Sequence, residues 1–116
     1  MAKVYGIHPL ELNPGVSGEA YEQFVTGEGA ALLHMFPGTK ISLVKGDRGA
    51  RAGKYAVIWE FDSVEARDAV FPPGQSPAEA AQQLPESVAR LLEKGAAMAR
   101  GGGDPQFFTD YVVVDE

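Results

Sequence analysis

The stretch Lys40–Phe61, KISLVKGDRGARAGKYAVIWEF, decides the fold of this chain. Two apolar runs, Ile41–Val44 and Tyr55–Phe61, flank a glycine-rich basic loop at residues 45–54. Short runs rich in β-branched and aromatic residues, separated by a loop that contains Gly, are typical of two strands joined in a hairpin. The rest of the chain is therefore interpreted as elements that pack onto this hairpin.

Before the hairpin the sequence predicts one strand and one helix. Lys3–His8 has the β-branched and aromatic residues of a short strand. Gly6 interrupts it, which indicates a bulge or a close approach by another group. A helix follows over Gly18–Met35, where apolar residues recur at helical spacing. Gly27 and Gly29 within this helix favour close packing or a bend.

After the hairpin the sequence predicts a divided helical layer and a last strand. Asp62 and Glu65 have the spacing of a capping box, which starts a helix. A serine followed by a proline starts a second helical piece, and a further proline interrupts that piece before its main part. These elements are predicted over Ser63–Phe71, from Ser76 to a break near Gln83 or Leu84, over Glu86–Ala99 and, for the strand, over Gln106–Val114.

The resulting order, βαββαβ, is that of the ferredoxin-like fold. It predicts a single α+β domain over residues 1–116, with a four-stranded antiparallel sheet and helices on one face. The strands are apolar on both faces, however, since Tyr55 and Trp59 alternate with Ile58. We therefore expect a second sheet to cover the open face, supplied by a second copy in a homodimer or in an oligomer of dimers. The alternative is a monomer with an unusually apolar exposed sheet.

The composition excludes several classes of protein. The chain has no cysteine, which removes disulfides, thiol catalysis and thiolate metal sites and fits a reducing cytoplasm. The net charge of −6 argues against nucleic acid as a partner, because phosphate binding needs a broad basic face. No apolar run approaches the roughly 20 residues of a membrane helix, and the first residues lack the pattern of a signal peptide. A cytoplasmic protein without a membrane partner is expected.

The loop between the two central strands concentrates positive charge on this acidic chain. Its cations, which form a candidate anion patch, are Lys45, Arg48, Arg51 and Lys54. A phosphate-loop signature does not fit, because Arg48 and Tyr55 stand where that signature needs Gly and Ser or Thr. The loop therefore either recognises an anionic ligand or is a solvated loop whose cations meet acidic side chains of its own protomer or of a partner.

The passage VIWEFDSVEARDAVF, residues 57–71, together with the topology and the length, resembles the dimeric α/β-barrel superfamily. That superfamily includes antibiotic-biosynthesis-type monooxygenases, EthD-like proteins and stress-responsive A/B-barrel proteins. The passage LELNPGVSGEAYEQF, residues 10–24, is similar to the strand-to-helix passage of the last group. The resemblance implies that two sheets face each other in a dimer and that a reactive cleft lies between sheet and helices in each protomer.

The resemblance also bears on Trp59, the only tryptophan of the chain. In the monooxygenase and haem-degrading branches, a Trp at a similar place works with an Asn on the first strand and a His on the second helix. Neither companion is present here, since the first strand carries Gly6-Ile7-His8 and residues 64–70 contain no His. Haem degradation is therefore disfavoured, and no cofactor is expected.

Four side chains are the candidates for a pocket between the sheet and the first helix. His8, at the rim of the sheet, is the candidate acid or base, because imidazole changes protonation near neutral pH. Tyr21, Phe24 and Trp59 are the candidate walls of an organic ligand, and plain core packing is the alternative for each. His8 and His34 stand at unrelated places without carboxylates at ligand spacing, so no metal site is expected.

Three functions fit these residues. The first is binding of a small, partly aromatic organic molecule between sheet and helices. The second is a cofactor-independent monooxygenase or isomerase that uses His8 or a tyrosine as base and Trp59 as wall. The third is an assembly module whose hairpin loop is an interaction surface. The first two need a cavity that reaches Trp59 or His8, and the third needs none.

Overall fold

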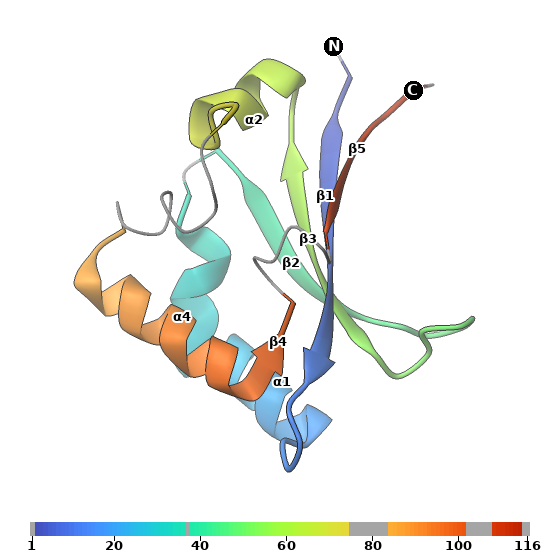
Figure 1. Ribbon diagram of the computed structural model, residues 1–116, viewed down its shortest axis with the longest axis vertical. Helices are drawn as coiled ribbons and strands as arrows, with labels where there is room; N and C mark the ends of the chain where they lie inside the picture. The colour runs from blue at the N-terminus through green and yellow to red at the C-terminus, as the bar shows by residue number, and fades with distance from the viewer. Residues whose placement is uncertain (1, 37, 75–83, 102–107, 115–116) are drawn as a thin grey trace.

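The computed structural model describes residues 2–36, 38–74, 84–101 and 108–114, and it shows an α+β fold built on an antiparallel sheet (Figure 1). The predicted helical piece that starts at Ser76 and the first residues of the predicted last strand lie outside this described part. The elements are β1 (Val4–Leu12), α1 (Gly18–Thr26), the 3-10 helix η1 (Glu28–His34), β2 (Lys40–Lys45), β3 (Tyr55–Phe61), α2 (Val64–Val70), α4 (Glu86–Met98), β4 (Ala99–Arg100) and β5 (Thr109–Val112).

β1 is the central strand of the sheet. It pairs with β3 along one edge, and with β5 and then β4 along the other. β2 pairs with β3, so the order is β2-β3-β1-β4, with β5 beside the first half of β1. This arrangement is compatible with the expected ferredoxin-like fold. The sheet has five strands and not the predicted four, because the chain after α4 contributes two short strands to the same edge of β1.

β1 is longer than the predicted first strand and runs through Pro9. The carbonyl oxygen of Lys3 accepts a hydrogen bond from the backbone N–H of Val113 at 2.9 Å, and every second residue of a strand directs its backbone groups to the same edge. Pro9 shares this direction. In the described part of the chain, that edge has no partner between Ile7 and Glu11, so the missing N–H of proline removes no ladder bond.

The predicted first helix is divided at Gly27. The helix α1 begins where predicted, since the Ser17 hydroxyl accepts a hydrogen bond from the backbone N–H of Ala20 at 3.1 Å. Gly27 then leaves the helical conformation, with φ −111° and ψ −103°, and the chain continues as η1. Gly29 allows η1 to approach α1, because a Cβ there would lie 2.8 Å from ring carbons of Phe24. The bend and the close packing suggested by these two glycines are both present.

Gly29 and Gly95 both lie near the Phe24 ring, and replacing each with alanine is expected to have opposite effects on the stability of the protein. At position 29 a Cβ would overlap the Phe24 ring and lie 3.0 Å from its carbonyl oxygen, so Gly29→Ala should destabilise the protein by about 1–3 kcal/mol. At position 95 the nearest atom would be 3.6 Å away, so Gly95→Ala should stabilise α4 by up to about 1 kcal/mol. Urea denaturation measures both changes, and changes of the same sign would contradict this packing.

The start of α2 differs by one residue from the predicted capping box. The N-cap is Ser63 and not Asp62, because the Ser63 hydroxyl accepts a hydrogen bond from the backbone N–H of Ala66 at 3.0 Å. Ser63 is buried, so its hydroxyl needs this partner. α4 begins at Glu86, where the main part of the divided helix was predicted, directly after Pro85.

The helices lie on one face of the sheet (Figure 1), and the core is the layer between them. A cluster of buried side chains joins β1, α1, β3 and β4, and its members are Leu10, Tyr21, Phe24, Val25, Tyr55 and Ala99. The side-chain amide of Asn13 donates to the carbonyl oxygens of Ala96 and Ala97, which fixes the end of β1 to α4. None of the described helices is long and apolar enough to cross a membrane.

The opposite face of the sheet has no described helix over it (Figure 1). Strand alternation places five large apolar or aromatic side chains there, and we name them the outer face: Tyr5, Ile7, Val44, Ile58 and Tyr111. Tyr111 is 57% exposed and Val44 is 37% exposed. The apolar character that the sequence indicated for both sides of the sheet is therefore uncovered on one side.

Candidate functional site

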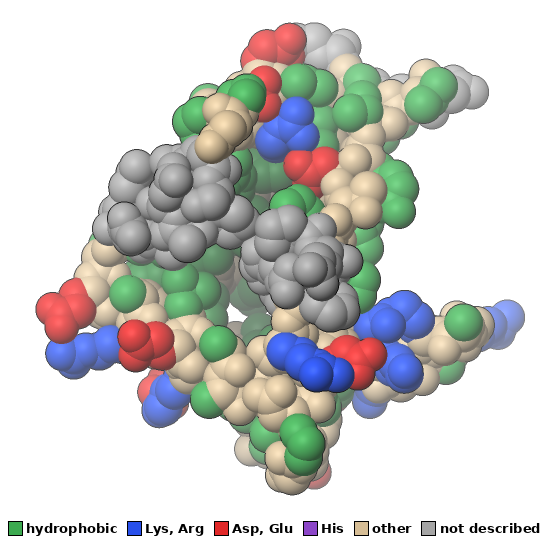
Figure 2. Space-filling model, in the orientation of Figure 1, with side chains coloured by type: hydrophobic (Ala, Val, Ile, Leu, Met, Phe, Trp, Pro, Cys, Tyr) green, Lys and Arg blue, Asp and Glu red, His purple; other side chains and the backbone are tan. Residues whose placement is uncertain are grey.

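A cavity of about 590 Å³ lies between the sheet and the helices. Its walls come from the inner face of β1, β2 and β3 and from α1, η1 and α4, and they are mostly apolar. The aromatic side chains in these walls are Tyr21, Phe36, Trp59, Phe61, Phe71 and Phe108. Figure 2 shows hydrophobic side chains gathered above α4 on this side of the molecule. The volume and the apolar lining are typical of sites for small organic molecules.

The structure brings three of the four predicted pocket residues to the cavity. His8, Tyr21 and Trp59 all line it. Phe24 does not lie among the lining residues; it packs in the buried cluster, with a ring edge near Gly29. Tyr21 and Phe24 stand on the same helix, and only one of them reaches the cavity.

His8 lies between two aromatic rings of the cavity wall. Its imidazole stacks on Phe108 with ring centroids 4.8 Å apart and an angle of 10° between the ring planes. The Trp59 ring is 5.5 Å away on a different strand. Trp59 in turn packs against Phe36 and Phe71, at 5.5 and 5.3 Å. The imidazole is therefore held in a mainly aromatic environment.

Gly6 leaves room for two polar atoms at this wall. A Cβ at position 6 would lie 2.9 Å from Oδ1 of Asp110 and 3.2 Å from Nε2 of His8. Asp110 stands directly opposite Gly6 in the pairing of β1 with β5, and it lines the cavity together with His8. The close approach that a glycine in the first strand indicated is thus made by a carboxylate and an imidazole.

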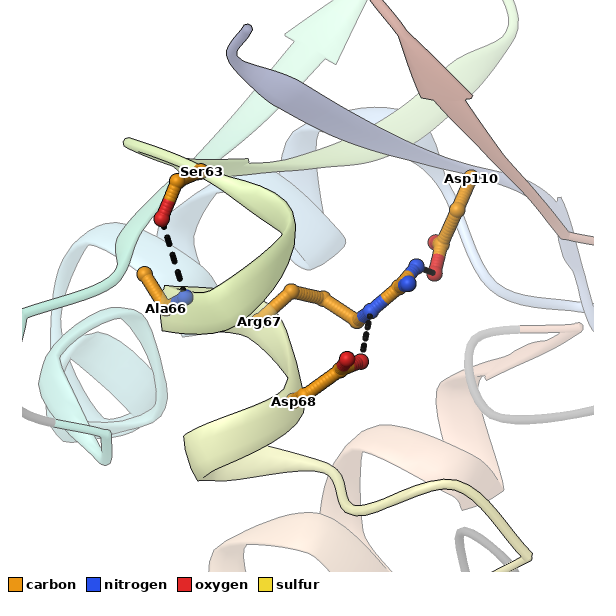
Figure 3. A network of polar contacts seen from close by, with 5 residues as sticks. All are labelled: Ser63, Ala66, Arg67, Asp68 and Asp110. Atoms are coloured by element: carbon orange, nitrogen blue, oxygen red, sulfur yellow. Dashed lines mark hydrogen bonds and ion pairs between the residues drawn. The ribbon is translucent and has the colours of Figure 1, made fainter. Parts of the chain in front are cut away.

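Arg67 holds the other oxygen of Asp110 (Figure 3). Its Nη1 donates to Oδ2 of Asp110 at 2.8 Å, and its Nε donates to Oδ1 of Asp68 at 2.9 Å. Burial disfavours the charged guanidinium, but the hydrogen bonds and the negative charges of Asp68 and Asp110 outweigh this effect and raise the pKa of Arg67. The Ser63 cap starts the helix that carries Arg67, so the ion pair also fixes α2 to β5.

The sequence contained a signal for Asp110 that our prediction did not use. Asp110 is the charged residue within FFTDYVVV, a run that is otherwise apolar apart from one threonine. A carboxylate in such a strand needs a partner, and a cation on the helical layer was the natural candidate. The strand alternation also places Asp110 on the same face as Gly6 and His8.

The cations of the candidate anion patch have separate partners. Nη2 of Arg51 donates to the carbonyl oxygens of Leu10 and Tyr55, at 3.3 and 3.0 Å, so this guanidinium fastens the loop to the sheet. Nζ of Lys45 lies 3.7 Å from the Glu22 carboxylate and 5.7 Å above the centre of the Tyr55 ring. The other two, Arg48 and Lys54, are exposed on the loop.

Tyr55, in the buried cluster, joins the hairpin to α1. Its hydroxyl donates to the Glu22 carboxylate, and this hydrogen bond, followed by burial and the negative charge of Glu22, raises the pKa of Tyr55 to about 12. The folded protein therefore holds this proton more tightly than the unfolded chain, whose tyrosine has a pKa of 10.0. The resulting stability is fully present below pH 10 and is lost as the pH rises towards 12.

The variant Glu22→Gln is expected to reduce this alkaline effect. It removes the charge and the strongest acceptor, so the pKa of Tyr55 should fall towards 10.0 and the tyrosinate absorbance of the folded protein should appear at lower pH. The Tyr55→Phe variant serves as the control, because it lacks the titrating group. An unchanged alkaline titration in Glu22→Gln would show that the hydrogen bond does not determine this pKa.

Comparison with known protein families finds no match for this sequence, and comparison with curated proteins finds none either. The part of the chain that the structure describes contains no group of three or more His, Cys, Asp or Glu side chains that could hold a metal ion. The function is therefore inferred from the cavity and from the polar atoms beside Gly6.

Proposed function

We propose that this protein binds a small, partly aromatic organic molecule in the cavity between its sheet and its helices. The observation that carries the proposal is the aromatic cavity of about 590 Å³, which His8, Tyr21 and Trp59 line. Apolar walls supply affinity in proportion to the area removed from water, at roughly 25 cal/mol per Å². The few polar groups, among them His8 and Asp110, orient the ligand. The composition without cysteine supports a cytoplasmic location.

Fluorescence titration tests this proposal, because Trp59 is the only tryptophan and lies in the cavity wall. Two-ring aromatic ketones, phenols and carboxylic acids are added to the protein. At least one compound is expected to change the Trp59 emission with a saturating dependence on concentration. A signal that no compound alters would contradict the proposal.

Two neighbouring residues provide a matched pair of variants for this titration. Val57→Phe fills the cavity, because Val57 lines it, and should weaken binding by about tenfold or more, since overfilling a packed site costs about 1–3 kcal/mol. Ile58→Phe makes a similar change on the outer face and should bind as the unchanged protein does. Equal affinities in the two variants would place the ligand elsewhere.

The same proposal includes a homodimer in which two outer faces meet. An exposed apolar sheet face is rare in soluble monomers, and a two-fold axis lets one patch cover its own copy. The charged side chains of Lys3 and Glu60, 3.5 Å apart, lie at the end of this face and would form part of the polar rim. Such pairing would give the dimeric α/β barrel that the resemblance implies, and oligomers of these dimers are compatible with it.

A catalytic role is the second candidate function. The specific observation in its favour is that Nε2 of His8 and Oδ1 of Asp110 approach the same point above Gly6, and that both residues line the cavity. An imidazole beside a carboxylate is suited to act as a base without a cofactor. This arrangement would serve a cofactor-independent monooxygenase or isomerase. An assembly module alone would need neither the cavity nor these groups.

A further inference from the structure

We infer that His8, Asp110 and Arg67 form a proton-transfer site at one wall of the cavity, acting on a ring ketone with acidic hydrogens next to its carbonyl group. The inference rests on the proposed ligand cavity and assigns its chemistry. His8 is the base, Asp110 stabilises the imidazolium, and Arg67 is a positioning residue that acts through Asp110.

The first line of evidence is the position of the two carboxylate oxygens of Asp110. Oδ2 accepts from Arg67 at 2.8 Å, and the guanidinium is itself held by Asp68 at 2.9 Å. This contact fixes the carboxylate so that Oδ1 points to the space above Gly6. Nε2 of His8 borders the same space, which a side chain at position 6 would occupy. The absence of a side chain at Gly6 therefore permits the carboxylate and the imidazole to approach the same space.

The second line of evidence is the net charge of the residues next to His8. Arg67 is shared between two carboxylates, so the group of Arg67, Asp68 and Asp110 carries one net negative charge. A proton taken up by His8 creates a positive charge next to Asp110, and the negative group stabilises it. The rings of Trp59 and Phe108 flank the imidazole, so this attraction is screened less than in water.

The reaction balances without a further reagent. The C–H bond next to the ketone breaks, its proton forms an N–H bond with His8, and the electron pair moves onto the carbonyl oxygen as an enolate. The imidazolium either exchanges its N–H proton with water and then protonates the same carbon, or delivers its proton to a conjugated carbon. The first outcome is exchange of hydrogen with water, and the second is an isomerisation. Neither outcome needs an oxidant or a reductant.

The cavity walls and the polar pair formed by His8 and Asp110 together define the class of substrate. The apolar cavity accepts an aromatic or fused ring, and the polar pair lies at its wall beside Trp59. The compound 2-tetralone has both features, because its ketone lies in a ring fused to benzene and its neighbouring hydrogens are acidic. It is used here as the probe.

The experiment follows deuterium uptake by 2-tetralone in D₂O by NMR, with Trp59 fluorescence as the separate measure of binding. The protein should accelerate uptake over buffer by about 100-fold, the lower range for a positioned general base. His8→Gln should abolish this acceleration, and Asp110→Asn should reduce the rate at saturating probe by about tenfold or more. The dissociation constant from fluorescence should stay within about twofold in Asp110→Asn, because the ring contacts remain.

Two further variants separate this role from a structural one. Asp62→Asn removes an equal charge from the exposed residue just before the same helix, and Asp62 does not line the cavity, so exchange should continue. Gly6→Ala places a Cβ 2.9 Å from Oδ1 of Asp110 and 3.2 Å from Nε2 of His8, so these side chains must shift and exchange should be lost, and the thermal midpoint shows that the variant is folded. This variant keeps the test valid if Asp110→Asn does not fold.

Each outcome decides the inference. Binding of 2-tetralone without exchange above buffer overturns it and leaves the proposed ligand cavity standing. Exchange at an undiminished rate in folded Asp110→Asn or Gly6→Ala, or a rate that falls equally in Asp62→Asn, also overturns it. Absence of binding by every aromatic compound overturns the proposed function together with the inference.

Discussion

Replacing Ile58 with aspartate is expected to convert the proposed dimer to a monomer of 12.4 kDa. Ile58 belongs to the outer face, in the centre of β3 and opposite Ile7 of β1. In a two-fold dimer each copy would bury the new carboxylate without a partner, and the cost of several kcal/mol per unpaired ion would be counted twice. Light scattering at micromolar concentration measures the change.

The control for this experiment adds the same charge to a helix. Ser87 is exposed near the start of α4, where a negative charge suits the helix dipole, so Ser87→Asp should leave the proposed dimer intact. The thermal midpoint of the Ile58→Asp monomer shows whether the protomer remains folded. A species of 12.4 kDa in the unchanged protein would remove the dimer from the proposal.

The hairpin strands could be predicted because each is a short run rich in β-branched and aromatic residues, and successive side chains of a strand then alternate between the two faces. Once β1 and β3 are placed side by side, the same alternation puts His8 and Trp59 on the inner face and Ile58 on the outer face. The continuation of β1 through Pro9 could not be predicted. It depends on β3, which pairs with β1 as far as Leu10, and on the gap between β5 and β4 along the other edge of β1.

Local ambiguity explains the remaining differences. Asp62 and Ser63 are both able to cap a helix, and burial of Ser63 in the folded chain selects the second. Tyr21 and Phe24 share one helical stripe, and the sequence does not reveal which of them faces a cavity and which packs behind it. The ion pair of Arg67 with Asp110 joins residues 43 positions apart, so it required the arrangement of α2 and β5 in space.

The variant Phe24→Ala is expected to lower the free energy of unfolding by about 3–5 kcal/mol, as large-to-small changes of a buried phenylalanine do. The Phe24 ring is buried in the cluster that joins α1 to β3, and it packs against Gly29 of η1 and Gly95 of α4. Domains have free energies of unfolding of only about 5–15 kcal/mol, so the loss is a large part of the total. Urea denaturation of the variant and of the unchanged protein measures it.

The milder variant Phe24→Leu separates this core role from a ligand contact. It should remain folded and bind aromatic compounds with a dissociation constant within about twofold of the unchanged value, because the side chain lies behind the cavity wall. Trp59→Leu, which alters the wall itself, is the comparison, with binding followed by calorimetry because the fluorophore is removed. If Phe24→Leu kept its stability but no longer bound the ligand, Phe24 would be a binding residue, as the sequence first suggested. The cavity would then extend to Phe24, which would contact the ligand as well as the buried cluster.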